Sequence, residues 1–301
     1  MNCGGRFGVF VSALENCVSR RRRPRRRGGS SSFPSRLSET ALHVHRWRAG
    51  DLIAPPRPLG CIGDLERHLE AVSNKCTRAI VVTDGVFSMR GDHAPLDRIM
   101  MLARAYDGAF AENVIVAVDD SHGVGAFGKT GRGTEEYTGS GPADLLVATL
   151  GKALGVNGGY VVAEETVIRY LRETSPFYIY SNPITPAEAA AAHKAIDILD
   201  SPPGMSLLAH LRAMTARFRA GLAKLRLETL PGEHPVVPLM LRDAARTSAL
   251  IAHLRREGIL ATGLNYPVVP KGDEEIRFQI TADHTAADVD SALRALARFA
   301  E

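Results

Sequence analysis

Residues 144–155 read DLLVATLGKALG, and this stretch decides the fold. Its apolar run at 144–149 has the composition of a buried strand, and a glycine-flanked lysine, Lys152, follows directly. A second apolar run at 114–118 is followed by the sequence DDSH at 119–122. In a sheet of parallel strands, ligands collect where the strands end. We therefore expect the polar ends of both runs to meet at one edge of a sheet.

The chain after residue 64 alternates strand and helix patterns, which predicts an α/β fold with a mostly parallel sheet. The expected strands are 78–84, 114–119, 144–149, 159–163, 236–241, about 259–263 and 275–280. The expected helices are one through Leu65, Leu69 and Val72, then 95–106, 186–200, about 205–225, 247–257 and 286–299. We predict an atypical, partly disordered segment at 1–63, a large domain at 64–204 and a small α+β domain at 205–301.

Composition excludes several classes of protein. No apolar run reaches the roughly 18 residues that a membrane helix needs. The four cysteines have neither metal-type spacing nor the pattern of a disulfide framework, so we predict no metal and a cytoplasmic location. Residues 20–27 hold seven arginines, and their positive charge is larger than the net charge of the whole chain, which is +4. Basicity is therefore local, and we predict no nucleic-acid-binding face.

The polar residues at the strand ends are the groups that a pyridoxal phosphate site needs. Lys152 offers an amine for a Schiff base, and Asp119 offers a carboxylate for the pyridine nitrogen. His122 and Ser88 are candidates to hydrogen-bond the ring oxygen, and Thr149 is a candidate donor to the phosphate. Each of these side chains alone has an ordinary structural explanation, as a turn or strand residue. Their combination indicates the cofactor site.

One further candidate lies in the predicted small domain. Arg277 is in the predicted strand at 275–280, where a guanidinium can bind a substrate carboxylate through two parallel hydrogen bonds. The alternative is a charge on an edge strand.

Two other motifs compete with this interpretation. Residues 123–128 lie in the sequence HGVGAFG, which contains the GxGxxG pattern of dinucleotide sites. That pattern must open a helix, and the glycines at 131 and 133 disfavour one. The pair Gly151-Lys152 lacks both the hydroxyl residue and the earlier glycine of a phosphate loop. The dinucleotide interpretation is therefore disfavoured, and the phosphate-loop interpretation is rejected.

Together these residues resemble the α-oxoamine synthases, a family of fold-type-I pyridoxal phosphate enzymes. The resemblance runs from about residue 79 to residue 301 and rests on the segments at 83–89 (TDGVFSM), 118–122 (VDDSH), 131–133 (GRG), 149–155 and 276–277. Three stretches are most similar to the glycine C-acetyltransferases of that family: 180–183 (YSNP), 266–272 (YPVVPKG) and 281–285 (TADHT).

The resemblance implies an aspartate aminotransferase-like large domain, a small C-terminal domain and a homodimer. It implies condensation of glycine with acetyl-CoA to give 2-amino-3-oxobutyrate and CoA. Lys152 is then the Schiff-base lysine and proton carrier, and Ser181 contacts phosphate from the partner subunit. The alternatives are the sister activity of 8-amino-7-oxononanoate synthase, with a related amino acid and acyl-CoA, and a catalytically inactive fragment.

The N-terminal part departs from the family. The chain starts about a hundred residues late, and neither the phosphate-binding loop nor the ring-stacking histidine has a counterpart, which implies truncation. Residues 20–60 carry the arginine run and a serine run instead. We interpret them as an out-of-frame reading of a GC-rich gene. The alternative is a genuine basic arm.

Overall fold

The computed structural model describes residues 7–11 and 62–300, so the predictions made for the arginine run and its surroundings lie outside the described residues. The chain divides into two compact units. The first comprises residues 1–83 and 98–117, and the second comprises residues 84–97 and 118–301. All the candidate site residues belong to the second unit.

The first unit holds β1 (Phe7–Val11), α2 (Ile62–Val72) and most of β2 (Arg78–Asp84), α3 (Leu96–Tyr106) and β3 (Asn113–Asp119). Strand β1 pairs antiparallel with β2, and Phe7 lies opposite Thr83. Helix α2 buries the apolar face that the sequence predicts, with Leu65, Leu69 and Val72 all at most 1% exposed. The predicted bounds of β2 are confirmed, and those of α3 and β3 differ by one residue.

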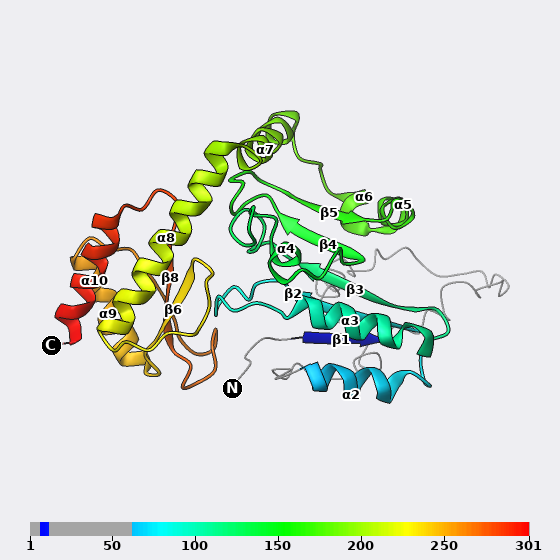
Figure 1. Ribbon diagram of the computed structural model, residues 1–301, viewed down its shortest axis with the longest axis horizontal. Helices are drawn as coiled ribbons and strands as arrows, with labels where there is room; N and C mark the ends of the chain where they lie inside the picture. Colours follow the sequence, from blue (N-terminus) through cyan, green and yellow to red (C-terminus); the bar gives the residue numbers. More distant parts are fainter. Residues whose placement is uncertain (1–6, 12–61, 301) are drawn as a thin grey trace, which may run out of the picture. The chain divides into compact units, whose positions relative to one another are not determined.

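The carboxyl ends of β2, β3 and β4 (Leu145–Thr149) lie side by side. The amide of Gly85 donates to the carbonyl of Asp119 at 2.7 Å, and the amide of Asp120 donates to the carbonyl of Val147 at 2.8 Å. Five strands are hydrogen-bonded in the order β1-β2-β3-β4-β5. The sheet is mixed, because β5 (Gly159–Ala163) runs antiparallel to β4 (Figure 1). The loop at 150–158 is too short for the helix that a parallel crossover needs.

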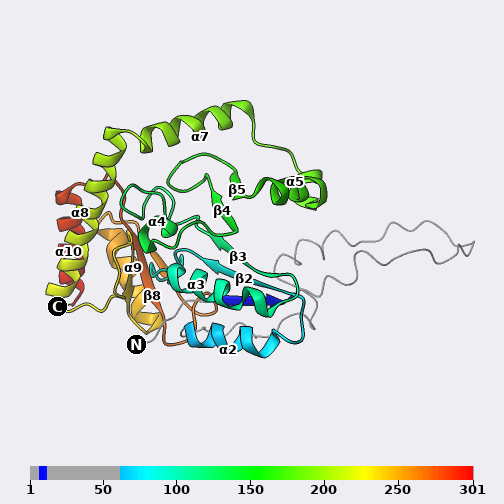
Figure 2. The same cartoon turned by 45° about the vertical axis from the view of Figure 1, so that its right-hand side comes forward.

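Helices follow β5 in close succession. Helices α5 (Glu165–Thr174) and α6 (Pro176–Tyr180) were not predicted, because neither buries a side chain. Helix α7 (Pro186–Leu199) follows the predicted range and begins with a capping box. Figure 2 shows α7 leading into α8 (Pro202–Lys224). The predicted start of α8 at residue 205 was wrong, because its prolines occupy the first turn, where a missing N–H costs nothing.

The last part of the chain builds a three-stranded antiparallel sheet in the order β6-β8-β7. Its strands are β6 (Val236–Met240), β7 (Thr262–Leu264) and β8 (Glu275–Gln279), and helices α9 (Ala244–Arg256) and α10 (Ala286–Ala300) complete it. The predicted strand at 259–263 was too early, because Leu260 is 96% exposed.

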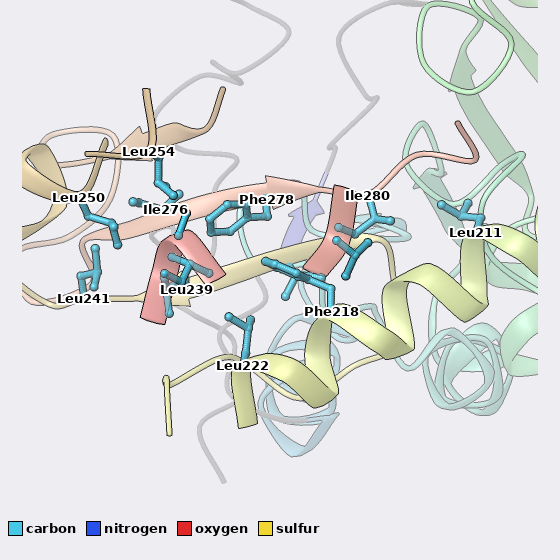
Figure 3. Packing of buried hydrophobic residues seen from close by; sticks show 14 of the residues in the cluster. Leu211, Phe218, Leu222, Leu239, Leu241, Leu250, Leu254, Ile276, Phe278 and Ile280 are labelled. Carbon is cyan, nitrogen blue, oxygen red and sulfur yellow. The ribbon is translucent and has the colours of Figure 1, made fainter. Parts of the chain in front are cut away.

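Apolar side chains from α8 and the small sheet form one core. Figure 3 shows Phe218 of α8 facing Phe278 and Ile276 of β8, and the two phenyl centroids lie 5.0 Å apart. Each such side chain contributes about 1.5–3 kcal/mol when it is fully buried. The core therefore fixes β8, the strand that carries Arg277.

Candidate active site

The end of β3 is tied to the end of β4 through side chains. Asp119 is the last residue of β3, and its Oδ1 accepts the amide of Ser121 at 3.0 Å. The hydroxyl oxygen of Ser121 in turn accepts the amide of Thr149 at 2.9 Å. The Asp119 carboxylate is exposed, so it can reach a ligand at the sheet edge.

The loop that carries Lys152 is closed by Thr149. The Thr149 hydroxyl donates to the carbonyl of Gly158 at 3.1 Å and accepts the amide of Gly151 at 3.1 Å. The side chain of Lys152 is exposed. Its amine is therefore accessible to a ligand at this sheet edge.

His122 lies close to both cations of the site. Burial, and after it the charges of Lys152 and Arg277, lower the pKa of His122 to about 4. The imidazole is therefore neutral at pH 7. A neutral ring can donate one N–H and accept at its other nitrogen. It is not the imidazolium cation that would serve as a general acid near neutral pH.

Asp84 belongs to the same electrostatic neighbourhood, although sequence reasoning did not place it there. Burial raises the pKa of Asp84, the charge of Asp119 raises it further, and the charge of Lys152 lowers it. Two carboxyl groups and an amine therefore meet at the ends of β2, β3 and β4. The position of Asp84 at the end of β2, the strand beside β3, could have identified it from the sequence.

Arg277 lies on β8, the central strand of the small sheet, so the edge-strand alternative is wrong. Burial lowers the pKa of Arg277, and the charge of Glu275 opposes this shift. Its Nε atom is buried without a hydrogen-bond partner within the described residues, and its Nη2 donates to Gln279 at 3.4 Å. A half-buried guanidinium with an unused N–H can bind an acceptor such as a carboxylate.

Two predicted residues are not joined to this cluster. Ser88 is half-buried in the turn after β2, and the exposed Ser181 donates its hydroxyl to the carbonyl of Phe177. Across residues 62–300, no hydrogen bond or ion pair connects either serine with His122, Lys152 or Asp119.

Asp120 is the buried acid beside the site that sequence reasoning missed. It is 0% exposed, its Oδ2 accepts the amide of Thr134 at 2.7 Å, and its Oδ1 accepts the Thr134 hydroxyl at 2.6 Å. A Cβ on Gly85 or Gly123 would lie 2.2 or 2.1 Å from the Asp120 carboxylate. Burial raises the pKa of Asp120 to about 6. Thr134 begins α4 (Thr134–Thr138), so this acid anchors the glycine-rich loop.

Glu275 is a second buried acid, and it is two residues from Arg277. It is 2% exposed, and its Oε1 lacks a hydrogen-bond partner among the described residues. Burial raises the pKa of Glu275 to about 7, while the charges of Arg90 and Arg277 lower it.

Two cavities of the second unit are lined by residues other than those of this cluster. One of about 600 Å³ is lined by Phe127, Tyr137 and Arg219, among others, and one of about 620 Å³ by Tyr160 and Leu199, among others. Neither includes Asp119, His122 or Lys152. No helix of the described residues is long and apolar enough to cross a membrane.

Comparisons with known proteins identify relatives of this chain. The class I and II aminotransferase family matches residues 61–296. The 8-amino-7-oxononanoate synthase of Marinobacter nauticus is 37% identical over 281 residues, which cover 90% of this chain and 66% of that protein. The 2-amino-3-ketobutyrate coenzyme A ligase of Escherichia coli is 38% identical over 239 residues, which cover 78% of this chain and 58% of that protein.

A solved structure of SPT (serine palmitoyltransferase) with PLP superposes with a TM-score of 0.73 and 26% identity. The match covers 79% of this chain and 58% of that chain. The fold predicted from the sequence is confirmed by this likeness. The chain spans 66% and 58% of the lengths of the two curated relatives above.

Proposed function

The chain belongs to the class I and II aminotransferase family, within the α-oxoamine synthases, and from this we propose that it is a pyridoxal phosphate-dependent acyltransferase. The proposed reaction joins an amino acid to the acyl group of an acyl-CoA. One observation carries the proposal, which is the convergence of Asp119, His122 and Lys152 at neighbouring strand ends. The two relatives described above and the PLP-containing SPT structure support it.

The residues present fit the cofactor. The exposed Asp119 carboxylate is available to hold a proton on a pyridine nitrogen, and the exposed Lys152 amine is available to a carbonyl carbon. The buried Nε of Arg277 still needs an acceptor. When bound, pyridoxal phosphate supplies an electron sink for the electron pair left at the amino acid Cα after its proton departs.

We assign the remaining roles to this chain's own residues. Lys152 would hold the cofactor through its Nζ atom and would then move the Cα proton, because it is an exposed amine at this sheet edge. Arg277 binds the substrate carboxylate through its unused N–H. His122 is neutral at pH 7, so it orients the ring oxygen by hydrogen bonding and transfers no proton.

Three further assignments remain proposals. Ser88 contacts the ring oxygen, Thr149 contacts the phosphate, and Ser181 does so from the partner of a homodimer. Thr149 would have to turn its hydroxyl away from Gly158 to donate to phosphate. We also propose a cytoplasmic location, a large domain at 64–204 and a small domain at 205–301.

We propose glycine and acetyl-CoA as the substrates, on the resemblance of the stretches at 180–183, 266–272 and 281–285 to glycine C-acetyltransferases. The second candidate activity is that of 8-amino-7-oxononanoate synthase, the name of several relatives at 37–40% identity. A relative named 2-amino-3-ketobutyrate coenzyme A ligase has 38% identity, so similarity alone favours neither.

The test is a titration of the purified chain with pyridoxal phosphate, followed by absorbance. We expect an imine band that is lost in Lys152→Ala and kept in Lys129→Ala, because both lysines are exposed and follow a glycine but only Lys152 belongs to the cluster. Absence of the band in the unsubstituted chain would favour the catalytically inactive alternative.

Thiol release from acyl-CoA then separates the two activities. Release from acetyl-CoA that requires glycine supports the acetyltransferase, whereas release from a pimeloyl thioester that requires alanine supports the sister activity.

A further inference from the structure

His234 is a buried histidine that the proposed reaction does not use. It is 2% exposed and stands two residues before β6. Its Nδ1 lies 3.1 Å from the amide nitrogen of Val236, and its Nε2 lies 2.9 Å from the carbonyl oxygen of His122. One imidazole therefore connects the entry to the small sheet with the loop that follows β3.

The two partners fix the tautomer of His234. A backbone amide can only donate, so Nδ1 accepts from Val236 and carries no proton. A carbonyl oxygen can only accept, so Nε2 carries the proton and donates it to His122. A single neutral form satisfies both bonds.

The surroundings keep this ring neutral and in place. The pKa of His234 is lowered to about 4, mainly by burial; the charges of Arg219, Arg277 and His93 act in the same direction, and the bond to the His122 carbonyl opposes the shift. These groups come from α8, from β8 and from the loop after β2. Arg219 also donates to the carbonyl oxygen of His234 at 3.3 Å, which holds its main chain.

The bond to His122 reaches the proposed site directly. The imidazoles of His122 and His234 meet edge to face with centroids 6.2 Å apart. The rings of His234 and Phe127 are also T-shaped to each other, with centroids 5.7 Å apart. Phe127 stacks on Tyr137, with ring centroids 3.8 Å apart. The loop after β3 is thus held at its His122 carbonyl on one side and by Asp120 on the other.

We propose that His234 is a positioning residue, which holds the main chain of His122 so that the His122 imidazole stays beside Lys152 and can orient the cofactor ring. This inference rests on the proposed function for the role of His122. The geometric part, that His234 sets the position of His122, is independent of any cofactor.

Two substitutions separate positioning from general packing. In His234→Gln, the side-chain amide nitrogen can reach the place of Nε2 and donate to the His122 carbonyl, but the bond from Val236 is lost. In His234→Asn, the side-chain oxygen can accept the amide two residues on, as in an Asx-turn, but nothing reaches His122. Both variants lose the ring and one hydrogen bond, so a purely structural role predicts equal effects.

The first measurement is imidazole nitrogen NMR of the histidine-labelled full chain without cofactor, as a function of pH. In the unsubstituted chain we expect His234 to be the Nε2-protonated neutral form, and His122 to stay neutral down to about pH 5. In His234→Asn the freed His122 should begin to titrate near its ordinary range around 6.5. In His234→Gln it should remain neutral.

The second measurement is pyridoxal phosphate affinity. Loss of one buried hydrogen bond that orients a binding group should weaken binding about tenfold in His234→Asn, and His234→Gln should stay within about twofold. Equal behaviour of the two variants in both measurements, or an Nδ1-protonated His234 in the unsubstituted chain, overturns the proposal. If the unsubstituted chain binds no cofactor, the proposed function fails while the NMR comparison still decides the role of His234.

Discussion

Replacing Asp120 with asparagine should change how stability depends on pH. The folded pKa of Asp120 is about 6, against an ordinary value of 3.8, and burial is the main cause. Because the folded pKa is raised, the folded state binds the proton more tightly than the unfolded state does. Stability from this group is therefore greatest below about pH 4, falls as pH rises to about 6, and is constant above that.

The size of the effect follows from the shift. One pKa unit corresponds to about 1.4 kcal/mol, so an ionised Asp120 costs the folded state about 3 kcal/mol relative to a neutral group. The amide oxygen of an asparagine can accept the Thr134 amide, and the Thr134 hydroxyl can turn to accept from the side-chain NH₂. Asp120→Asn should thus match the unsubstituted chain near pH 4 and exceed its stability by up to about 3 kcal/mol near pH 8.

Urea denaturation of both proteins at a series of pH values measures this difference, because the other titrating groups cancel in the comparison. Thr134→Val is the companion variant, since it removes a donor to the carboxylate. Its cost should be larger near pH 8 than near pH 4, because a bond to a charged acceptor contributes about 1.5–3 kcal/mol and a neutral one about 1 kcal/mol. A stability gap between Asp120→Asn and the unsubstituted chain that is the same at both pH values would refute the reasoning.

Three more predictions concern stability in urea at neutral pH. Gly85→Ala should cost about 2 kcal/mol or more, because the new Cβ would lie 2.2 Å from a buried carboxylate oxygen, whereas Gly108→Ala has nothing within 4 Å and should stay within about 0.5 kcal/mol. Phe218→Ala should cost about 3–5 kcal/mol at 1% exposure, and Leu260→Ala, at 96% exposure, should cost almost nothing. Thr185→Ala breaks the capping box of α7 and should cost about 1 kcal/mol, most of which Thr185→Ser should restore.

The sequence predicts the buried strands well because their apolar runs leave little choice of conformation. Strands β2, β3 and β4 lie within a residue of the predicted ranges, and their polar ends meet as expected. Helices α5 and α6 could not be predicted in this way, since they bury no side chain and so show no apolar face to detect. Hydrophobic periodicity in the sequence indicates a buried face, so it cannot predict a helix whose side chains all stay exposed.

The buried polar groups of the site are set by distant contacts that no local pattern reports. His234 is buried because it meets His122, which is 112 positions away in the chain. Glu275 begins β8, and it is buried together with the residue before it and the residue after it, so the simple alternation of a half-exposed strand fails. The burial of such a group can be recognised only when the fold places its distant contact residue beside it.

The two adjacent acids at the end of β3 show what alternation can still reveal. Along β3 the even-numbered residues from 114 to 118 are buried and the odd-numbered ones are more exposed. Since successive side chains of a strand point to opposite faces, continuing this alternation sends Asp119 outward and Asp120 inward. Residue chemistry alone cannot tell the two apart. The alternation of the strand does, because it leaves the Asp119 carboxylate exposed to solvent and turns the Asp120 carboxylate inward, where it accepts hydrogen bonds from Thr134.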